Sequence, residues 1–502
     1  MIEEYYESLK TGKNLRKDLI ALKQALKEEP LKQELLEILQ GDVSLLLELL
    51  QHPEPKVRGN AALVLGRLGQ NKVVIPLYKA YQQETQLFIK SNYLSAMKGL
   101  DITICKSELE ERLRELEYGK PKEEEEKHIR EELKVLRNLL QSNQKHKKHK
   151  FQGYDEKYEV ILTTEKNYQE ITAKQIKNEK IVLMKNGVHV ITNHIKQLID
   201  IPTYKEILFP LNQKKLAPEP KLAAKTLANS NLMELLKKAY KSEGNFYFRL
   251  GVHSKMPLDK RSAFAKKCAF ALEKETASVL CNSTSDYEVE IRLMETKEGN
   301  FLPLLKFYTL EEKRFAYRAH TVATSIRPEL AALMVRLARC YMSEYAKVLD
   351  PFCGVGTMLI ERDRICPART MYGIDLFGEA IKGARENAKL ARKKIHYIQR
   401  DFFTFQQECL FDEIITNMPD KGKKTKEEQD LLYEKFFKKA SEILEDKAKI
   451  FMYSNEKNFV KKQLRLRKEY TLIQEYPMDA EGIHNFFVLE VNKVHNAKKD
   501  KG

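Results

Sequence analysis

The chain has 502 residues, of which 42% are hydrophobic and 32% charged, a balance typical of folded globular proteins that excludes a disordered or fibrous chain. Because single cores stop growing at about 250–300 residues, this length predicts three or four domains. The formal net charge of +16 favours a polyanionic partner, although a lysine-rich surface that only keeps the protein soluble would give the same number.

Two further features bear on compartment and on metals. No run of about 18 apolar residues occurs, and the first residues lack the basic and apolar segments of a signal peptide, so we expect a cytoplasmic protein with no membrane partner. The seven cysteines stand singly between Cys105 and Cys409 without a CxxC pair, and the histidines form no HExxH pattern. We therefore expect reduced cysteines and no metal site.

Residues 1–118 are predicted to form a helical domain with internal repeats. The segment at 53–69 aligns with the segment at 86–100, which gives a period of about 31 residues. Two helices joined at a proline turn, the second opening with Val-Arg and ending in Leu-Gly, resemble a HEAT-type unit, whose apolar face is buried by stacking on its neighbours. An ordinary helical bundle is the alternative. A repeat stack would also offer a surface to a protein partner.

Residues 119–150 are predicted to be a charged helical linker. Within it, residues 122–141 place four apolar side chains on one stripe of a helix, Ile129, Leu133, Leu136 and Leu140. The basic stretch at 145–150 is a candidate phosphate contact, but a short charge run is more often a solvated linker, so we assign it no site.

From residue 151 the pattern changes to an α+β region. Short β-type runs occur at 157–164 and 181–191, and the second is hinged at Asn186-Gly187 as in a hairpin. A helical patch follows the connection at 213–222. Next come a strand with the sequence NFYFRLGVHS, a helix from about Asp259 to Glu275, and strands at 287–296 and 301–309.

The later part of this region resembles the THUMP domain of RNA-modifying enzymes. The resemblance is carried by FRLGVHS, the basic helix after it, LCNSTSDYEVEIRL and LKFYTLEEKRFAYR. It implies a ferredoxin-like domain at 151–230, a THUMP-like RNA-binding domain at 231–311, and an RNA partner that these two domains hold for a catalytic domain. The residues alone give weaker support for RNA binding, because a lysine-rich helix is more often solvated than bound to a ligand.

The stretch AKVLDPFCGVGTMLIER at 346–362 reads as a strand, a glycine turn and a helix. Gly354 and Gly356 allow the backbone to turn tightly and approach a ligand, as at the switch point of doubly wound sheets. The next strand ends in Asp375, about 20 residues on, where an acid can accept hydrogen bonds from ribose hydroxyls. A dinucleotide-binding enzyme would have the same glycine turn and acidic residue, but this sequence lacks the GxGxxG motif of such enzymes.

DPFCGVGT resembles the first motif of class I RNA methyltransferases. The resemblance implies a Rossmann-like seven-stranded domain at 312–495, with S-adenosylmethionine as cofactor. It further implies that the acid of the third motif, Asp401 in QRDFF, binds the adenine amino group and that Phe402 lies next to the ring. The residues expected to bind the cofactor are Asp350, Phe352, Cys353, Gly354, Gly356, Thr357, Asp375, Asp401, Phe402 and Asn417.

The family carries its catalytic tetrapeptide after the next strand, usually Asn or Asp, Pro, Pro, then Tyr or Phe. This sequence has Asn417, Met418, Pro419 and Asp420 there. A base amino group is a poor nucleophile because its lone pair is delocalised, so it must be held in line with the methyl group at about 3–3.5 Å. The Asn417 amide oxygen and the Met418 carbonyl can accept its N–H bonds, and Pro419 stiffens the turn.

Asp420 departs from this pattern, because the aromatic residue that it replaces stacks on the flipped base in the family. Three outcomes stay open: another ring stacks on the base, Asp420 bonds to a base edge, or activity is lost. The candidate rings are Phe315, Tyr317, Phe486 and Phe487.

The predicted fold is multidomain: N-terminal α-helical repeats, a central α+β ferredoxin-like and THUMP module, a C-terminal class I methyltransferase domain and a basic tail at 496–502. The resemblance favours an enzyme that methylates N2 of a guanosine in transfer or ribosomal RNA. The alternatives are a non-catalytic RNA-binding protein that kept the fold, and an amino-methyltransferase acting on DNA adenine or protein glutamine. The sequence leaves the oligomeric state open.

Overall fold

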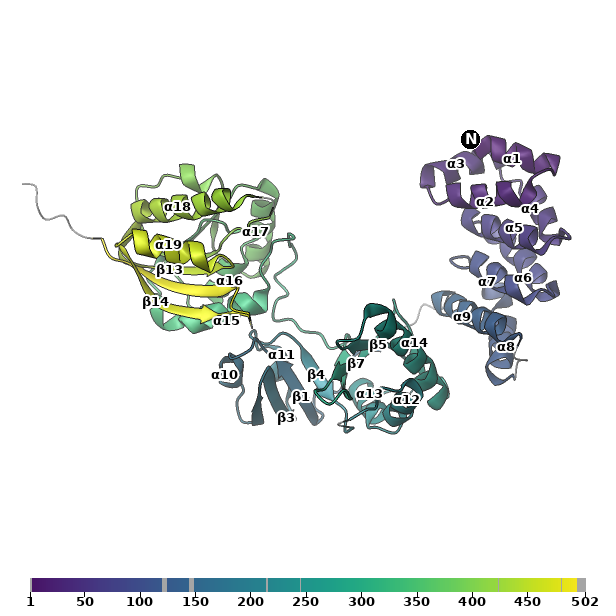
Figure 1. The fold of residues 1–502 in the computed structure, drawn as a ribbon, viewed down its shortest axis with the longest axis horizontal. Helices are drawn as coiled ribbons and strands as arrows, with labels where there is room; N and C mark the ends of the chain where they lie inside the picture. Colours follow the sequence, from purple (N-terminus) through teal and green to yellow (C-terminus); the bar gives the residue numbers. More distant parts are fainter. Residues whose placement is uncertain are drawn as a thin grey trace, which may run out of the picture. The chain divides into compact units, whose positions relative to one another are not determined.

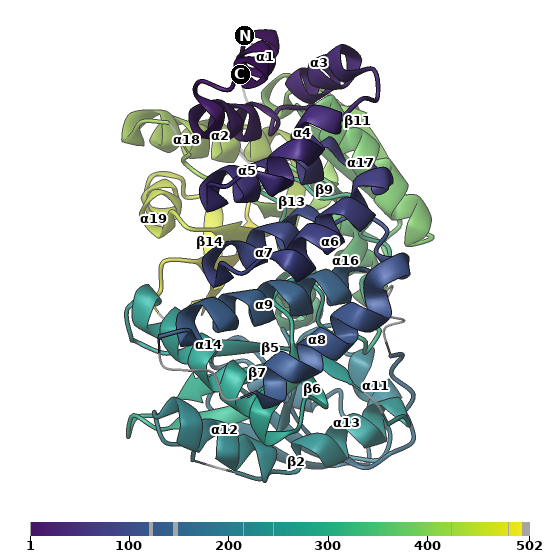
Figure 2. The same ribbon diagram turned by 90° about the vertical axis from the view of Figure 1, so that its right-hand side faces the viewer.

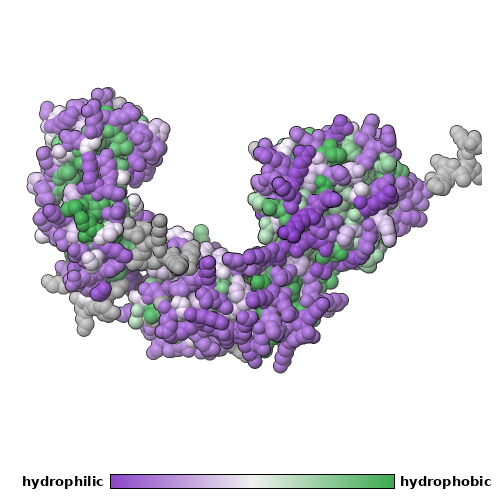
Figure 3. Space-filling model, turned by 180° about the vertical axis from the view of Figure 1, so that it is seen from behind, coloured by the Kyte–Doolittle hydropathy of each residue, from purple (hydrophilic) through white to green (hydrophobic). Residues whose placement is uncertain are grey.

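The protein is described by a computed structural model that covers residues 2–119, 124–143, 149–213, 215–243, 245–422, 424–479 and 481–493. It divides into two compact units, Met1–Lys148 and His149–Gly502. Figure 1 labels the helices and strands of both units. The face in Figure 3 is mostly hydrophilic, with scattered apolar spots. Among the described residues, no helix combines the length and apolar character that crossing a membrane requires.

The first unit is wholly helical in its described part. Its helices are α1 Ile2–Thr11, α2 Leu15–Ala25, α3 Glu29–Leu39, α4 Ser44–Glu48, α5 Pro55–Leu68, α6 Val74–Gln83, α7 Leu87–Ala96, α8 Lys106–Tyr118 and α9 Glu126–Asn143. Helix α2 packs on α5, α5 on α7 and α7 on α9, and Figure 2 shows these four helices one below another. The result is a stack of helices in which each layer buries the apolar face of the next.

Glycines mark the repeat along this stack. Gly12, Gly41, Gly69 and Gly99 all have positive φ angles and follow α1, α3, α5 and α7 at intervals of 28 to 30 residues. This left-handed conformation ends a helix at little cost only for glycine. The structural interval is close to the period expected from the sequence. Assignment to the HEAT class stays a prediction.

Helix α9 differs from the linker that the sequence suggested at 119–150. Its Leu136, Leu139 and Leu140 are buried in the same core as the earlier helices. Glu132 is fully buried on the same helix, where it accepts a 2.5 Å hydrogen bond from the Tyr81 hydroxyl. The stripe of leucines is therefore the last layer of the stack. Residues 144–148 of the basic stretch and the predicted tail at 496–502 lie outside the described residues.

The second unit begins with an eight-stranded sheet in the order β2-β3-β1-β4-β8-β7-β5-β6. Its strands are β1 Tyr158–Thr163, β2 Lys180–Met184, β3 Gly187–Thr192, β4 Ile207–Pro210, β5 Phe246–His253, β6 Leu280–Asn282, β7 Val289–Glu295 and β8 Phe301–Phe307. Strands β2 and β3 pair antiparallel with Met184 opposite Gly187, as the hairpin prediction required.

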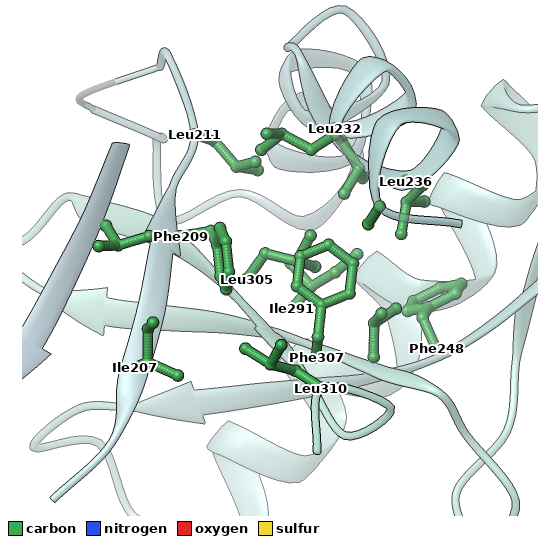
Figure 4. Packing of buried hydrophobic residues seen from close by; sticks show 14 of the residues in the cluster. Ile207, Phe209, Leu211, Leu232, Leu236, Phe248, Ile291, Leu305, Phe307 and Leu310 are labelled. Atoms are coloured by element: carbon green, nitrogen blue, oxygen red, sulfur yellow. The ribbon is translucent and has the colours of Figure 1, made fainter. Parts of the chain in front are cut away.

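The sheet runs through the boundary predicted at 230/231. Strand β4 pairs with β1 on one side and with β8 on the other, which joins the two expected domains into one sheet. A single hydrophobic core extends from Phe151 to Leu310, and Figure 4 shows Phe209 of β4 and Phe307 of β8 meeting within it. Their rings pack edge to face at 4.8 Å. The helices of this part are α10 Gln169–Ala173, α11 Ile195–Ile199, α12 Pro220–Ala228, α13 Leu232–Tyr240 and α14 Leu258–Glu275.

A seven-stranded sheet in the order β11-β10-β9-β12-β13-β15-β14 forms the rest of the second unit, as the class I fold predicts. Its strands are β9 Lys347–Asp350, β10 Thr370–Asp375, β11 His396–Gln399, β12 Phe411–Asn417, β13 Leu444–Ser454, β14 Tyr470–Pro477 and β15 Asn485–Val491. Strands β9 to β13 are parallel, and β15 is antiparallel to both β13 and β14. The helices are α15 Pro328–Ala338, α16 Thr357–Ile365, α17 Gly378–Leu390, α18 Lys426–Ile443 and α19 Lys457–Leu466.

Candidate active site

The predicted site residues meet at the carboxyl edge of the parallel strands. Strand β9 lies between β10 and β12, so the loop after Asp350 is flanked by Asp375 and Asn417. Asn417 is in turn opposite Tyr453 of β13. In open α/β sheets this edge, beside the strand where the order reverses, is where ligands bind.

Backbone hydrogen bonds hold the glycine loop against the neighbouring strand. The Gly354 N–H donates to the Asp375 carboxylate at 2.8 Å, and the Cys353 N–H donates to the Ile374 carbonyl at 2.9 Å. Within the loop, Asp350 accepts a bond from the Phe352 N–H at 3.1 Å. Two of the predicted acids thus shape the loop directly.

The two glycines of the loop face different surroundings. Gly354 has φ +52°, and a Cβ added there would meet no atom within 4 Å, so this side of the loop is open. Gly356 has φ +82°, and a Cβ there would lie 2.3 Å from the Tyr397 hydroxyl. The sequence therefore needs glycine at both positions for backbone conformation, and at Gly356 also for packing.

Burial changes the acid–base character of the loop. It raises the pKa of Asp350, which is 1% exposed, to about 7. It also raises the pKa of the Cys353 thiol well above its usual value. A buried thiol that stays protonated is not a nucleophile, which agrees with a packing role for Cys353.

The third predicted segment follows β11. Asp401 is exposed and accepts a hydrogen bond from the Phe403 N–H at 2.9 Å. Phe402 is only 2% exposed, and its ring packs edge to face on Phe352 at 5.7 Å. Both predicted rings therefore contribute to the core beneath the edge.

The sequence analysis missed two exposed apolar side chains at the same edge. Leu376 and Phe377, 60% and 70% exposed, come directly after Asp375. They add exposed apolar surface beside the acid at the end of β10. Their position after the acid at the end of β10 was the signal that could have revealed them.

A cavity of about 400 Å³ opens beside Asn417. It lies where the carboxyl ends of β12 and β13 meet the start of α15 and the connection between β14 and β15. Its lining residues are Glu165, Ala323, Thr324, Ser325, Ile326, Arg327, Leu330, Asn417, Met418, Asp420, Tyr453, Asn455, Met478, Asp479 and His484.

The loop of the predicted tetrapeptide is fixed at each of its last three residues. The Met418 N–H donates to the Tyr453 carbonyl at 2.9 Å, and the Met418 side chain is buried. The Pro419 carbonyl accepts a bond from the Gln429 side chain at 2.9 Å. Asp420 accepts a bond from the Asn455 amide at 2.9 Å, at the wall of the cavity.

The ring beside Asn417 is not one of the four expected from the sequence. Phe486 and Phe487 are fully buried, and Tyr317 is 6% exposed with its hydroxyl bound to Glu361. Phe315 is partly buried and packs against Tyr317, and it is not among the residues that line the cavity. Three of these rings belong to the hydrophobic core, and Phe315 packs against its edge.

Tyr453 and His484 supply the aromatic surface of the cavity. Their rings are stacked at 5.8 Å with an interplanar angle of 16°. Burial raises the pKa of Tyr453 to about 12, so its hydroxyl stays neutral. Burial would also raise the pKa of Asp479, but hydrogen bonds from the backbone N–H and ring of His484 outweigh it and lower that pKa.

The eight-stranded sheet contributes one residue to this cavity. Glu165, just after β1, binds Arg327 at 2.7 Å, and Lys205 binds the same carboxylate at 2.7 Å. Nearby, the Tyr168 hydroxyl donates to the Pro477 carbonyl at 2.9 Å. The two sheets of the second unit thus meet at the cavity. Within the part of the chain that the structure describes, no cluster of His, Cys, Asp and Glu could hold a metal ion.

The C-terminal domain is similar to a known protein family and to known proteins. Residues 316–484 match the family described as "RMKL-like, methyltransferase domain". The curated protein MG259 of Mycoplasma genitalium, described as uncharacterized, is 31% identical over 119 residues, which are 23% of this chain. The matched region spans about a quarter of that relative, 25% of its length.

Two solved structures share the fold of most of the second unit. TrmN from Thermus thermophilus is 20% identical with a TM-score of 0.50, covering 66% of this chain and 99% of that chain. SMU.472, a putative methyltransferase complexed with SAH, is 14% identical with a TM-score of 0.51, covering 69% and 99%.

The chain's own residues fit such a cofactor. Gly354 leaves open space over the loop, and Asp375 and Asp401 lie at the ends of neighbouring strands. Within the described residues, the buried Thr357 hydroxyl at the start of α16 has no hydrogen-bond partner. Residues 316–484 therefore form a methyltransferase domain with the class I architecture, and its residues fit S-adenosylmethionine as cofactor.

Proposed function

We propose that this protein methylates the N2 amino group of a guanosine in structured RNA, transfer or ribosomal RNA. The observation that carries the proposal is the cavity beside Asn417, which has an aromatic wall and lies at the end of β12, the strand that neighbours β9. A base amino group is reached only after the nucleotide leaves the stack, and a flipped base is held by stacking and by hydrogen bonds to its edge. The cavity offers both.

Asn417 is the residue that we propose orients the amino group. When bound, S-adenosylmethionine supplies an electrophilic methyl group on a sulfonium. The residues proposed to hold it are Asp350, Phe352, Cys353, Gly354, Gly356, Thr357, Asp375, Asp401, Phe402 and Asn417. Asn417 and the carbonyl of Met418 would accept the two N–H bonds of the amine, which turns the nitrogen lone pair toward the methyl group.

We propose that Tyr453 stacks on the flipped base. In the family that this loop resembles, the fourth residue of the tetrapeptide does so. Its ring lines the cavity and is braced by His484 at 5.8 Å. A base that stacks on an aromatic side chain gains about 1–3 kcal/mol. This position explains how a loop with Asp420 in place of an aromatic residue can still hold a base.

A second cavity, of about 540 Å³, supports contact with RNA phosphates. It lies at the carboxyl ends of β5 and β7, beside the start of α14. Its charged residues include Lys255, Arg261 and Lys297, against Glu295. Three cations around one hollow favour a phosphate group, and RNA is the polyanion that the resemblance to a THUMP domain implies.

The test is methyl transfer by the purified chain from labelled S-adenosylmethionine to total RNA, with DNA and protein as competing acceptors. We expect label in RNA as N2-methylguanosine. Asn417→Ala should lower the rate by at least about 100-fold, and Tyr453→Ala by about 5- to 150-fold, because a stacked base is worth about 1–3 kcal/mol. Tyr453→Phe is the matched control and should stay near wild type.

Other outcomes of this test would reject the proposal. Label in DNA adenine or in protein glutamine would show an amino-methyltransferase with a different substrate. RNA binding without transfer to any acceptor would show a protein that kept the fold and lost catalysis.

A further inference from the structure

Asp420 and Asn455 form a polar pair at the wall of the cavity that holds Asn417. The Asn455 amide nitrogen donates to the Asp420 carboxylate at 2.9 Å. A carboxylate only accepts hydrogen bonds, so this contact fixes which end of the amide faces Asp420. The amide has a second N–H group, and the carboxylate has further lone pairs. The pair can therefore present one donor and one acceptor, side by side, to a ligand.

The other carboxylates of the cavity are engaged in holding its walls. Glu165 binds Arg327 and Lys205. Asp479 accepts bonds from the backbone N–H groups of Ile483 and His484 and from the His484 ring. Asp420 differs from both because it is exposed and bound to a neutral amide. It is the carboxylate of this cavity that is best placed to accept hydrogen bonds from a ligand.

The bases differ in what they present to such a pair. The Watson–Crick edge of guanine carries the O6 acceptor, the N1–H donor and the N2 amino group in a row. Adenine carries an amino group beside an N1 lone pair, which a carboxylate repels. Base edges are told apart by this order of donors and acceptors, and one good two-bond contact is worth about 1–3 kcal/mol.

We propose that Asp420 and Asn455 read guanine in this cavity, an inference that rests on the function proposed above. Asp420 accepts the N1–H, the free N–H of Asn455 donates to O6, and Asn417 of the same loop accepts from the N2 amino group. In this arrangement Asn455, Asp420 and Asn417 match O6, N1–H and the N2 amino group of guanine in turn. The carboxylate that replaces an aromatic residue is thus the determinant of base choice, while Tyr453 supplies the stacking.

A purely structural role for the pair makes a different prediction. If Asp420 and Asn455 only brace the loop, removing Asp420 disturbs the binding of every base alike. If Asp420 accepts the N1–H, its removal weakens the binding only of a base that has that proton. A comparison of bases that differ at this one edge separates the two roles.

The experiment measures binding of mononucleotides to the full-length protein, by calorimetry or ligand-observed NMR. Saturating S-adenosylhomocysteine keeps adenosine-like probes out of the cofactor site. The probes are guanosine, adenosine and 2-aminopurine riboside 5′-monophosphates, the last of which keeps the amino group of guanine but lacks N1–H and O6. We expect the wild-type protein to bind the guanosine probe about 10- to 100-fold more tightly than the other two.

Asp420→Ala should lower the affinity for guanosine monophosphate toward that for the 2-aminopurine probe. The affinity for the 2-aminopurine probe should stay level or rise, because its N1 lone pair no longer faces a carboxylate. Asn455→Ala should lower guanosine affinity by a smaller factor. Asp155→Ala removes an exposed carboxylate outside the cavity and should change nothing. Equal binding of the three probes by wild type, or an equal loss for all three in Asp420→Ala, would overturn the proposal. If the protein discriminates between the bases but transfers no methyl group, guanine recognition by Asp420 and Asn455 is supported and the proposed methyltransferase function is rejected.

Discussion

At the residue scale, Gly356 and Tyr397 offer a test of the cofactor loop. Gly356→Ala places a methyl group 2.3 Å from the Tyr397 hydroxyl, in a backbone conformation with φ +82°. We expect the variant to lose about 1–3 kcal/mol of stability and to bind S-adenosylmethionine more weakly, because the loop must shift. Thermal unfolding and calorimetric titration measure the two effects.

Tyr397→Phe is the matched second change. Within the described residues the Tyr397 hydroxyl is buried without a hydrogen-bond partner, so its removal should cost little stability or raise it slightly. Added to Gly356→Ala, it should restore part of the lost affinity by removing the nearest contact. A double variant as defective as Gly356→Ala alone would show that backbone strain, and not this contact, decides the effect.

Site residues could be predicted from the sequence where they belong to one motif. The spacing of Gly354, Gly356 and Asp375 predicted a loop that the structure builds with the bond from Gly354 to Asp375. The ring of the cavity could not be found in this way. Tyr453 is 36 positions after Asn417, and only the parallel register of β12 and β13 places them opposite each other.

At the scale of elements, Glu206 joins the halves of the eight-stranded sheet. It lies directly before β4 and binds Arg292 of β7 and Lys306 of β8, each at 2.6 Å. Burial alone would raise the pKa of Glu206, but these two cations outweigh it and hold the pKa at about 2. The contribution to stability is therefore present above about pH 4.5 and is lost as the pH falls from there toward 2.

Glu206→Gln should lower the stability of the second unit by about 1–2 kcal/mol at pH 7, a value reduced for the partial exposure of the pair. The difference from wild type should shrink below pH 4, where the wild-type carboxylate begins to gain its proton. Calorimetric unfolding at several pH values measures this. Glu159→Gln, at a more exposed pair with His189, is the control. A difference that does not change between pH 7 and pH 3 would contradict the assignment.

Local elements could be predicted from periodicity, but their assembly could not. The hairpin of β2 and β3 follows from alternation and from Asn186-Gly187. The merging of two expected domains into one sheet depends on Phe209 of β4 pairing with Leu305 of β8, almost a hundred residues away. Likewise, the leucine stripe of α9 marks a buried face, but the sequence does not say which helices cover it.

At the scale of the whole molecule, the positive charge is unevenly distributed. Residues 1–118 contain 17 Lys and Arg against 18 Asp and Glu, so the net charge of +16 arises in the rest of the chain. The helical stack therefore adds little to the attraction of a polyanion. Its core is also separate from those of the second unit.

A chain of residues 149–502 should therefore fold, bind S-adenosylmethionine and bind RNA much as the full chain does. The affinity for RNA should fall with salt at a log–log slope of roughly −0.7 per contacted phosphate on single strands, and the slope should be the same for both chains. Filter binding across a salt series measures it. A shallower slope for the short chain would show that the helical stack contacts RNA, and a flat response for both would reject electrostatic RNA binding.

Whether this protein methylates guanosine in RNA is tested most directly by comparing modified nucleosides, by mass spectrometry, in transfer and ribosomal RNA from cells with and without this gene. We expect that one N2-methylguanosine is lost, that the wild-type gene restores it, and that Asn417→Ala does not. Unchanged methylation of both RNA classes without the gene would contradict the proposed function.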